Sequence, residues 1–351
     1  MKAILKYRLK AARPALIAGL VILVASVIAL FVDFGGNTDR FGTFYMFRMY
    51  TNTFGLPIIL MLLSVWLGMI LTSEYGDKNT EDFFSGLPVK KKDRFLVSVM
   101  LGFGVLLVMG IMSVVAVCIS HNVSYAQFAK INLRSEDYDI IVKLDGLGNA
   151  IARMVQMYMF AFFFYFIAVF AGVSSRDKKV AVLIIVLVLL FPLVFGEIIG
   201  LLEKLFSTEM TVIKDLIEYG SSYQLLDTNA YCYINDTLFV CYENLLESII
   251  VAGVMAVVFA ILAFLMATVV NRNYGKIVIG KALEKLFIVV IGIFAAGMIP
   301  MLLDVSNFDI GIVLVIMVAV FVLIVFLLHK LIYKNKKYSH LNAGEGKKNE
   351  N

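Results

Sequence analysis

The sequence comes closest to a catalytic motif at residues 275–282, which read Gly-Lys-Ile-Val-Ile-Gly-Lys-Ala. A phosphate-binding loop of this spacing needs a Ser or Thr after the lysine, because that hydroxyl binds Mg²⁺, and it needs a strand before the first glycine. Here Ala282 replaces the hydroxyl residue, and a long apolar run precedes the loop. We therefore interpret the segment as basic and amphipathic, and we expect no cofactor bound by this chain.

Hydrolase, protease and redox motifs are absent from the sequence. It contains no His-Glu-x-x-His, no Gly-x-Ser-x-Gly and no Cys-x-x-Cys. The three histidines, His121, His329 and His340, fall at separate borders of apolar runs, and none has a second ligand at metal-binding spacing. We expect no metal site, no catalytic residues and no enzymatic activity of the chain's own.

Ionisable residues inside apolar segments are the usual functional candidates in a membrane protein. In this sequence only Arg153 and Glu197 approach such a position. Both lie at the outer edge of an apolar run, where a long side chain can reach the membrane interface. The absence of a buried Asp, Glu and His relay disfavours a proton-driven carrier. It also removes the usual cues for an intramembrane protease.

Two of the three cysteines, Cys232 and Cys241, fall in one long segment predicted to lie outside the membrane. Their nine-residue separation allows a disulfide in an oxidising exterior, and the alternative is two reduced cysteines. Cys118 lies inside an apolar run and is interpreted as a packing residue.

A charged loop at residues 74–95 carries large apolar side chains. Asn79 or Thr80 can cap a short helix that ends at Gly86. The residues of this predicted docking helix are Glu81, Asp82, Phe83, Phe84, Leu87 and Pro88. Apolar groups rimmed by charge predict either a docking surface for a partner or side chains that dip into the bilayer interface.

The elements that position these residues are membrane helices. Of the 351 residues, 61% are hydrophobic and 16% charged, against about 25% charged in soluble domains. Eight uncharged runs are long enough for the roughly 20 residues that cross a bilayer. They cover residues 14–32, 49–73, 95–129, 154–175, 180–196, 248–271, 286–303 and 310–328. Because lipid offers no hydrogen-bond partners, the predicted fold is an all-α polytopic membrane protein with eight spans.

The distribution of charge predicts the orientation of these spans. With both termini cytoplasmic, the inner segments hold 23 of the 31 Lys and Arg residues, and the positive-inside rule is satisfied at every loop. The first run is too long for a signal peptide. Residues 197–206 and 212–219 have helical apolar spacing, and we expect two short amphipathic helices at the outer membrane surface.

The loop pattern Glu74-x5-Thr80-Glu81-x5-Leu87-Pro88-Val89-Lys90 resembles that of ABC-2-type transporter permease subunits. In that family the loop between spans two and three forms a coupling helix, which docks on a separate ATPase subunit. The resemblance implies a six-span core over residues 1–271 and an amphipathic elbow helix at residues 1–13. Residues 272–351 then add a loop, a two-span hairpin and a basic tail, as in eight-span permeases of Gram-positive bacteria.

The resemblance also implies partners and a function. ATP and Mg²⁺ would bind the ATPase subunit, a second identical or paralogous permease chain would complete the pathway, and no nucleic acid would be involved. The expected function is ATP-driven export of an apolar or amphipathic cargo, such as a lipid, peptide or drug, across the plasma membrane by alternating access. The alternative is a non-transporting membrane sensor or scaffold.

Overall fold

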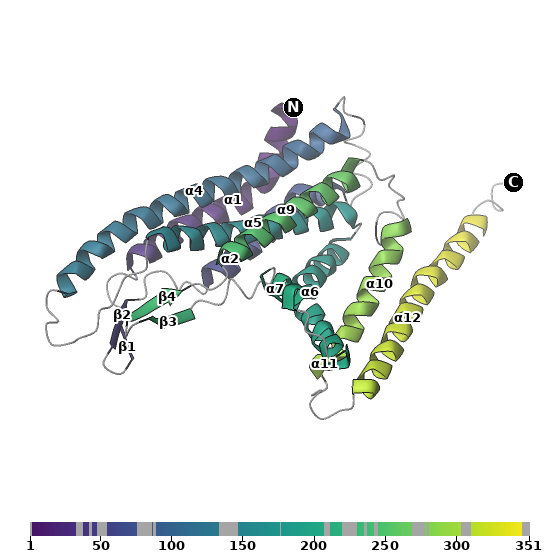
Figure 1. The fold of residues 1–351 in the computed structure, drawn as a ribbon. Coiled ribbons are helices and arrows are strands. Elements are labelled where there is room, and N and C mark those ends of the chain that lie inside the picture. The colour runs from purple at the N-terminus through teal and green to yellow at the C-terminus, as the bar shows by residue number, and fades with distance from the viewer. Residues whose placement is uncertain are drawn as a thin grey trace. The chain divides into compact units, whose positions relative to one another are not determined.

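The computed structural model of the chain is built almost entirely of helices (Figure 1). It describes residues 2–32, 38–41, 44–47, 55–75, 86, 89–132, 147–175, 177–206, 211–219, 230–234, 237–241, 245–268, 278, 281–302 and 310–345. The chain forms two compact units. The first comprises Met1–Ile185 and Glu218–Val270, and the second comprises Val186–Ile217 and Asn271–Asn351. Residues 186–217 thus group with the C-terminal part of the chain. The predicted division into residues 1–271 and 272–351 stays a prediction.

The first unit is a helix bundle with α5 at its centre. Its helices are α1 (Lys2–Val32), α2 (Gly55–Thr72), α4 (Lys91–Asn132), α5 (Leu147–Ser174) and α9 (Leu245–Thr268). A 3-10 turn, η2 (Ser73–Tyr75), continues α2. α5 packs most extensively on α9, then on α2 and α4, whereas α1 packs on α4 and α2. Of the apolar stretch of α5, 78% is buried, against 17% for α9, so α5 is the core helix.

Small residues let α2 approach α5 closely. A Cβ atom at Gly68 would lie 2.7 Å from Ala168 Cβ and 2.9 Å from the Tyr165 carbonyl oxygen. One turn further along, a Cβ atom at Gly172 of α5 would collide with the Thr72 hydroxyl. Such small-residue contacts are typical of membrane helices, where packing replaces the hydrophobic driving force of water.

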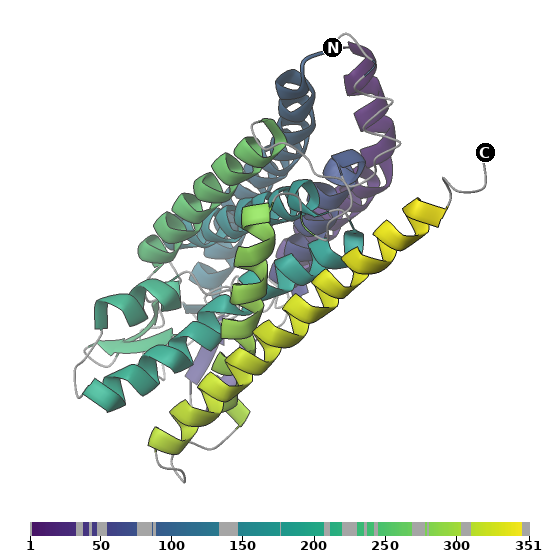
Figure 2. The same cartoon turned by 90° about the vertical axis from the view of Figure 1, so that its right-hand side faces the viewer.

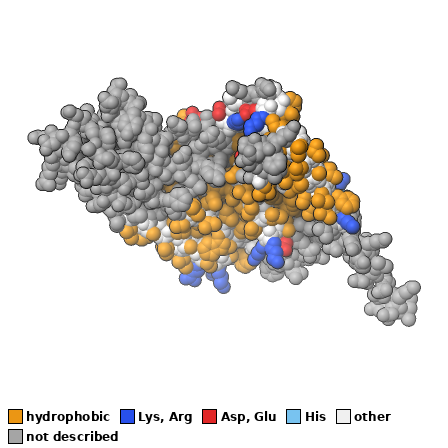
Figure 3. All heavy atoms as spheres, turned by 90° about the horizontal axis from the view of Figure 1, so that it is seen from below, with side chains coloured by type: hydrophobic (Ala, Val, Ile, Leu, Met, Phe, Trp, Pro, Cys, Tyr) orange, Lys and Arg blue, Asp and Glu red, His pale blue; other side chains and the backbone are white. Residues whose placement is uncertain are grey.

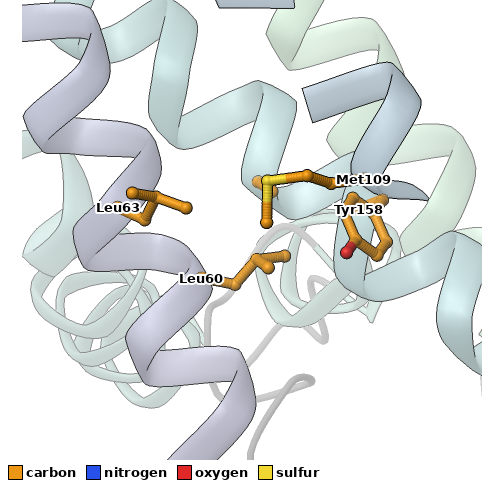
Figure 4. Packing of buried hydrophobic residues seen from close by; sticks show 5 residues of the cluster. Leu60, Leu63, Met109 and Tyr158 are labelled. Atoms are coloured by element: carbon orange, nitrogen blue, oxygen red, sulfur yellow. The ribbon is translucent and has the colours of Figure 1, made fainter. Parts of the chain in front are cut away.

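Apolar and aromatic side chains fill the space between α2, α4 and α5. Leu60 and Leu63 of α2 meet Met109 of α4 and Tyr158 of α5, together with Ala161 (Figure 4). The Tyr158 hydroxyl lies 2.8 Å from Ser113 Oγ, so the polar end of the ring is satisfied inside the bundle.

Two antiparallel hairpins add to the predicted all-α architecture. β1 (Thr38–Phe41) pairs with β2 (Phe44–Phe47), and β3 (Ala230–Ile234) pairs with β4 (Thr237–Cys241). Both hairpins lie at the end of the first unit where α1 ends (Figures 1 and 2).

The second unit pairs α10 (Lys281–Gly297) with α12 (Ile310–Glu345). A Cβ atom at Gly292 would lie 2.7 Å from Val325 and 3.0 Å from Phe321, so this glycine permits the close approach. α11 (Ile299–Leu302) follows α10, and the unit also holds most of α7 (Thr211–Tyr219) and of α6 (Lys178–Phe206).

Six helices in the described part of the chain are long and apolar enough to cross a membrane. They are Ile58–Tyr75, Lys91–Ile119, Ile151–Ser174, Lys178–Phe206, Leu245–Thr268 and Ile310–Lys330. Each overlaps one of the predicted spans, and Lys178–Phe206 contains the whole of the short run at residues 180–196. The other two predicted spans form α1 and the α10–α11 segment, which are not among the six, and the eight-span topology stays a prediction.

Two local features differ from the expectations, and a third agrees with them. α1 runs without interruption through Pro14, so a separate elbow helix over residues 1–13 is not confirmed. α6 continues through Pro192 to Phe206, so the first predicted surface helix is an extension of the preceding span. The second predicted surface helix is α7, a separate helix.

The surface agrees with a membrane protein. Hydrophobic side chains cover most of the described face seen from below, and Lys and Arg side chains gather at its margins (Figure 3). Large apolar residues such as Leu20, Val254 and Val315 are more than half exposed on their helices. An apolar surface of this extent requires lipid or a partner protein to cover it.

Candidate functional site

A buried ion cluster joins three helices of the first unit. It consists of Arg8 from α1, Glu74 from η2 and Arg94 from the first turn of α4. An Nη atom of Arg8 forms an ion pair with Glu74 Oε1, and Arg94 Nε lies 3.6 Å from the same oxygen. The three side chains are only 1–3% exposed.

Aromatic rings close the ion cluster off from solvent. The Arg94 guanidinium carbon lies 5.6 Å from the centroid of the Tyr75 ring. Tyr75 in turn makes an edge contact with Phe95, with centroids 6.2 Å apart, and Phe95 does the same with Phe264 of α9 at 6.1 Å. A guanidinium over an aromatic face is a favourable cation–π arrangement, and its strength grows when water is excluded.

Glu74 is the residue of the ion cluster whose loss should destabilise the fold most. One carboxylate is shared by two guanidinium groups, and all three have lost their hydration shells. Breaking a buried pair by removing one partner is strongly destabilising, because an uncompensated charge is left behind. The single carboxylate therefore holds α1, α2 and α4 together at this end of the bundle.

The ion cluster lies at both ends of the predicted docking loop. Glu74 lies just before residues 76–90, separated from them by Tyr75, and Arg94 follows them within one helical turn. Within this loop the structure describes only Gly86, Val89 and Lys90. The predicted docking residues Glu81, Asp82, Phe83, Phe84, Leu87 and Pro88 lie outside the described residues, and their docking role stays a prediction.

A second buried polar network joins α5 to α9 near the N-terminal ends of both helices. Arg153 donates a hydrogen bond to the Gln156 side-chain oxygen, and the Gln156 amide nitrogen donates to Ser248 Oγ. Ser248 Oγ also donates to the Leu245 carbonyl at 3.0 Å. Arg153 is 5% exposed, so its guanidinium is satisfied inside the bundle and needs no snorkelling.

The remaining predicted site residues are not brought together with either network. Glu197 is exposed on α6. Cys232 has Phe239 as its cross-strand partner, and Cys241 has Ala230, so the two cysteines are not paired directly across the hairpin. Their side chains lie outside what the structure describes, and the disulfide stays a prediction.

The described residues include no group of three or more His, Cys, Asp and Glu side chains that could hold a metal ion. The sequence-based expectations missed the ion cluster, although Glu74 opens the loop pattern that they singled out. The sequence offered one indication of the cluster, namely three charged residues near the borders of predicted spans. Charged residues at such borders are usually interpreted as exposed to water.

The chain matches no protein-family model, no curated protein and no solved structure. The fold and the six long apolar helices among the described residues define the class as a multi-pass membrane protein. The two buried polar networks in its first unit join helices that the sequence alone does not place together.

Proposed function

We propose that this chain is the membrane-spanning subunit of an ATP-driven transporter and that it works with a separate ATPase subunit. The loop at residues 76–90 would be the docking element. The proposed cargo is apolar or amphipathic, because the spans carry few ionisable groups that could bind a charged solute. The proposed direction of transport is export.

The observation that best supports this proposal is the shared carboxylate of Glu74. Because Arg8 and Arg94 both bind it, the helices before and after the loop are tied to each other and to α1. A push on the loop by a partner would therefore move three helices as one body. Rigid movement of helix groups is a common way to convert partner motion into alternating access.

The test is a double variant, Phe83→Ala with Phe84→Ala. Buried aromatic anchors dominate interface energies, and truncating one typically costs about 2 kcal/mol or more. The double variant should reach the membrane folded but lose the ATPase during affinity purification from its native host. Charge reversal at Glu81 should weaken the complex less and in a salt-dependent way, because rim charges act mainly on association.

Phe326→Ala with Leu327→Ala is the matched control, since both side chains are exposed on α12. This control should retain the ATPase. Full recovery of the ATPase with the Phe83 and Phe84 variant would contradict the docking role. A wild-type chain that purifies without any ATPase would instead favour a membrane sensor or scaffold.

A further inference from the structure

An apolar groove runs along the first unit between α4, α5 and α9. Its cavity volume is about 500 Å³, within the range of sites that hold small molecules. The lining residues are all apolar: Phe103, Met159, Phe162, Phe166, Gly253, Ala256, Val257, Ala260, Ile261 and Phe264. Such a groove on a membrane helix bundle faces the acyl chains of the bilayer unless a protein covers it.

Packed aromatic rings of α4 and α5 form one wall of the groove. Phe103 of α4 packs against Phe162 and Phe166 of α5, with ring centroids 4.9 Å and 6.3 Å apart. The opposite wall is α9, where Ala256 and Ala260 have small side chains and Gly253 lets the Met159 methyl group approach closely. Large rings on one side and small residues on the other leave room for a slender apolar chain.

The groove has the length of one membrane leaflet. Its lining on α9 extends from Gly253 to Phe264, and a helix rise of 1.5 Å per residue makes this about 16 Å. The hydrocarbon core of a bilayer is about 30 Å thick, so one leaflet contributes about 15 Å. The match in length favours a single acyl chain.

A cation lies at one end of the groove. The Lys92 ammonium is 5.8 Å from the centroid of the Phe264 ring, and Phe264 is the last groove residue along α9. Lys92 is exposed and follows Lys90 and Lys91, which are exposed as well, whereas the neighbouring Asp93 is half-buried. Positive potential at the polar end of an apolar groove complements an anionic headgroup.

We infer that the groove between α4, α5 and α9 binds an anionic glycerophospholipid of the bilayer, with an acyl chain along the groove and the headgroup phosphate against Lys92. The bound lipid would cover apolar surface of α9 and connect it to the start of α4. Binding needs neither an ATPase nor a transported cargo, so this inference is independent of the proposed function.

The test is native mass spectrometry of the purified full-length chain with added phosphatidylglycerol or phosphatidylcholine that carry the same acyl chains. Wild type should retain phosphatidylglycerol about fivefold better than phosphatidylcholine, the preference expected for one lysine near a phosphate. Lys92→Gln should bring the two lipids to equal retention. Lys10→Gln, which removes an exposed lysine from α1, should keep the wild-type preference.

A groove-filling variant tests the position of the acyl chain. Ala260→Phe should abolish retention of both lipids, whereas Val254→Phe, on an exposed part of α9 outside the groove lining, should not. If Ala260→Phe fails to fold, the Lys92→Gln result still decides. Lipid retention by Ala260→Phe at the wild-type level, or an unchanged preference in Lys92→Gln, would overturn the inference. A lipid-free wild-type dimer that Ala260→Phe converts to monomer would identify a second copy of the chain as the occupant instead.

Discussion

At the scale of single residues, charged and amide side chains buried in the first unit pair with side chains of other helices. Glu74 binds arginines from two other helices, and Gln156 connects Arg153 to Ser248. Each group would be costly inside a bilayer without these partners. The polar networks therefore specify which helices pack together, in addition to the apolar contacts.

Glu74→Gln should lower the free energy of unfolding by about 3–5 kcal/mol, because it leaves two buried guanidinium groups without a counter-charge. Thermal or denaturant unfolding in detergent measures this loss. Glu203→Gln is the control, because the Glu203–Lys214 ion pair is partly exposed and such pairs contribute about 1 kcal/mol or less. Equal losses for the two variants would contradict the structural role of the ion cluster.

At the scale of helices, burial runs opposite to hydropathy. α12 carries the most apolar of the six spans and is the least buried, whereas α5 and α2 are the least apolar and the most buried. A helix that faces lipid can be apolar on every side, but a core helix can carry polar groups that its neighbours satisfy. The more polar spans of this chain therefore form its core.

Gly68→Ala should destabilise the first unit by about 1–3 kcal/mol, because the added methyl group would push α2 away from the backbone of α5. Gly104→Ala on α4 is the control, since no atom lies within 4 Å of its added Cβ. Removing that glycine should be neutral or stabilise α4 by up to about 1 kcal/mol. Unfolding followed by the fluorescence of Trp66, on α2, compares the two, and similar stabilities would contradict close α2–α5 packing.

At the scale of the whole molecule, the distribution of charge and the long helices agree with a polytopic arrangement. In the part of the chain that the structure describes, six helices are long and apolar enough to span a bilayer. The segments predicted as inner hold most of the Lys and Arg residues. Because an added or missing span would invert every later segment, the position of each loop tests the span count.

Single cysteines at Lys143 and Ser221 should react with a membrane-impermeant maleimide in intact cells, whereas one at Lys337 should react only after lysis. The reason is the predicted eight-span topology with both termini in the cytoplasm. A background variant without Cys118, Cys232 and Cys241 serves as the unreactive control. Labelling at Lys337 in intact cells, or protection at Ser221, would show that the span count is wrong.

The sequence by itself determined the class of the protein and the position of most helices. Apolar runs of about 20 residues must form helices in lipid, because only there are the backbone N–H and C=O groups of one segment hydrogen-bonded to each other. For this reason even the short run at residues 180–196, interrupted by Pro192, lies inside a continuous helix.

Only the tertiary structure decided which helix is central and which polar groups meet. Arg8 is far from Glu74 and Arg94 in the chain, and Gln156 and Ser248 are separated by 92 positions. Whether such groups pair depends on which helix faces approach each other, and apolar runs that lack a periodic polar side do not specify those faces. The close approach at Gly68 and Gly172 and the groove beside α9 arise from the same packing, so neither could be read from one segment alone.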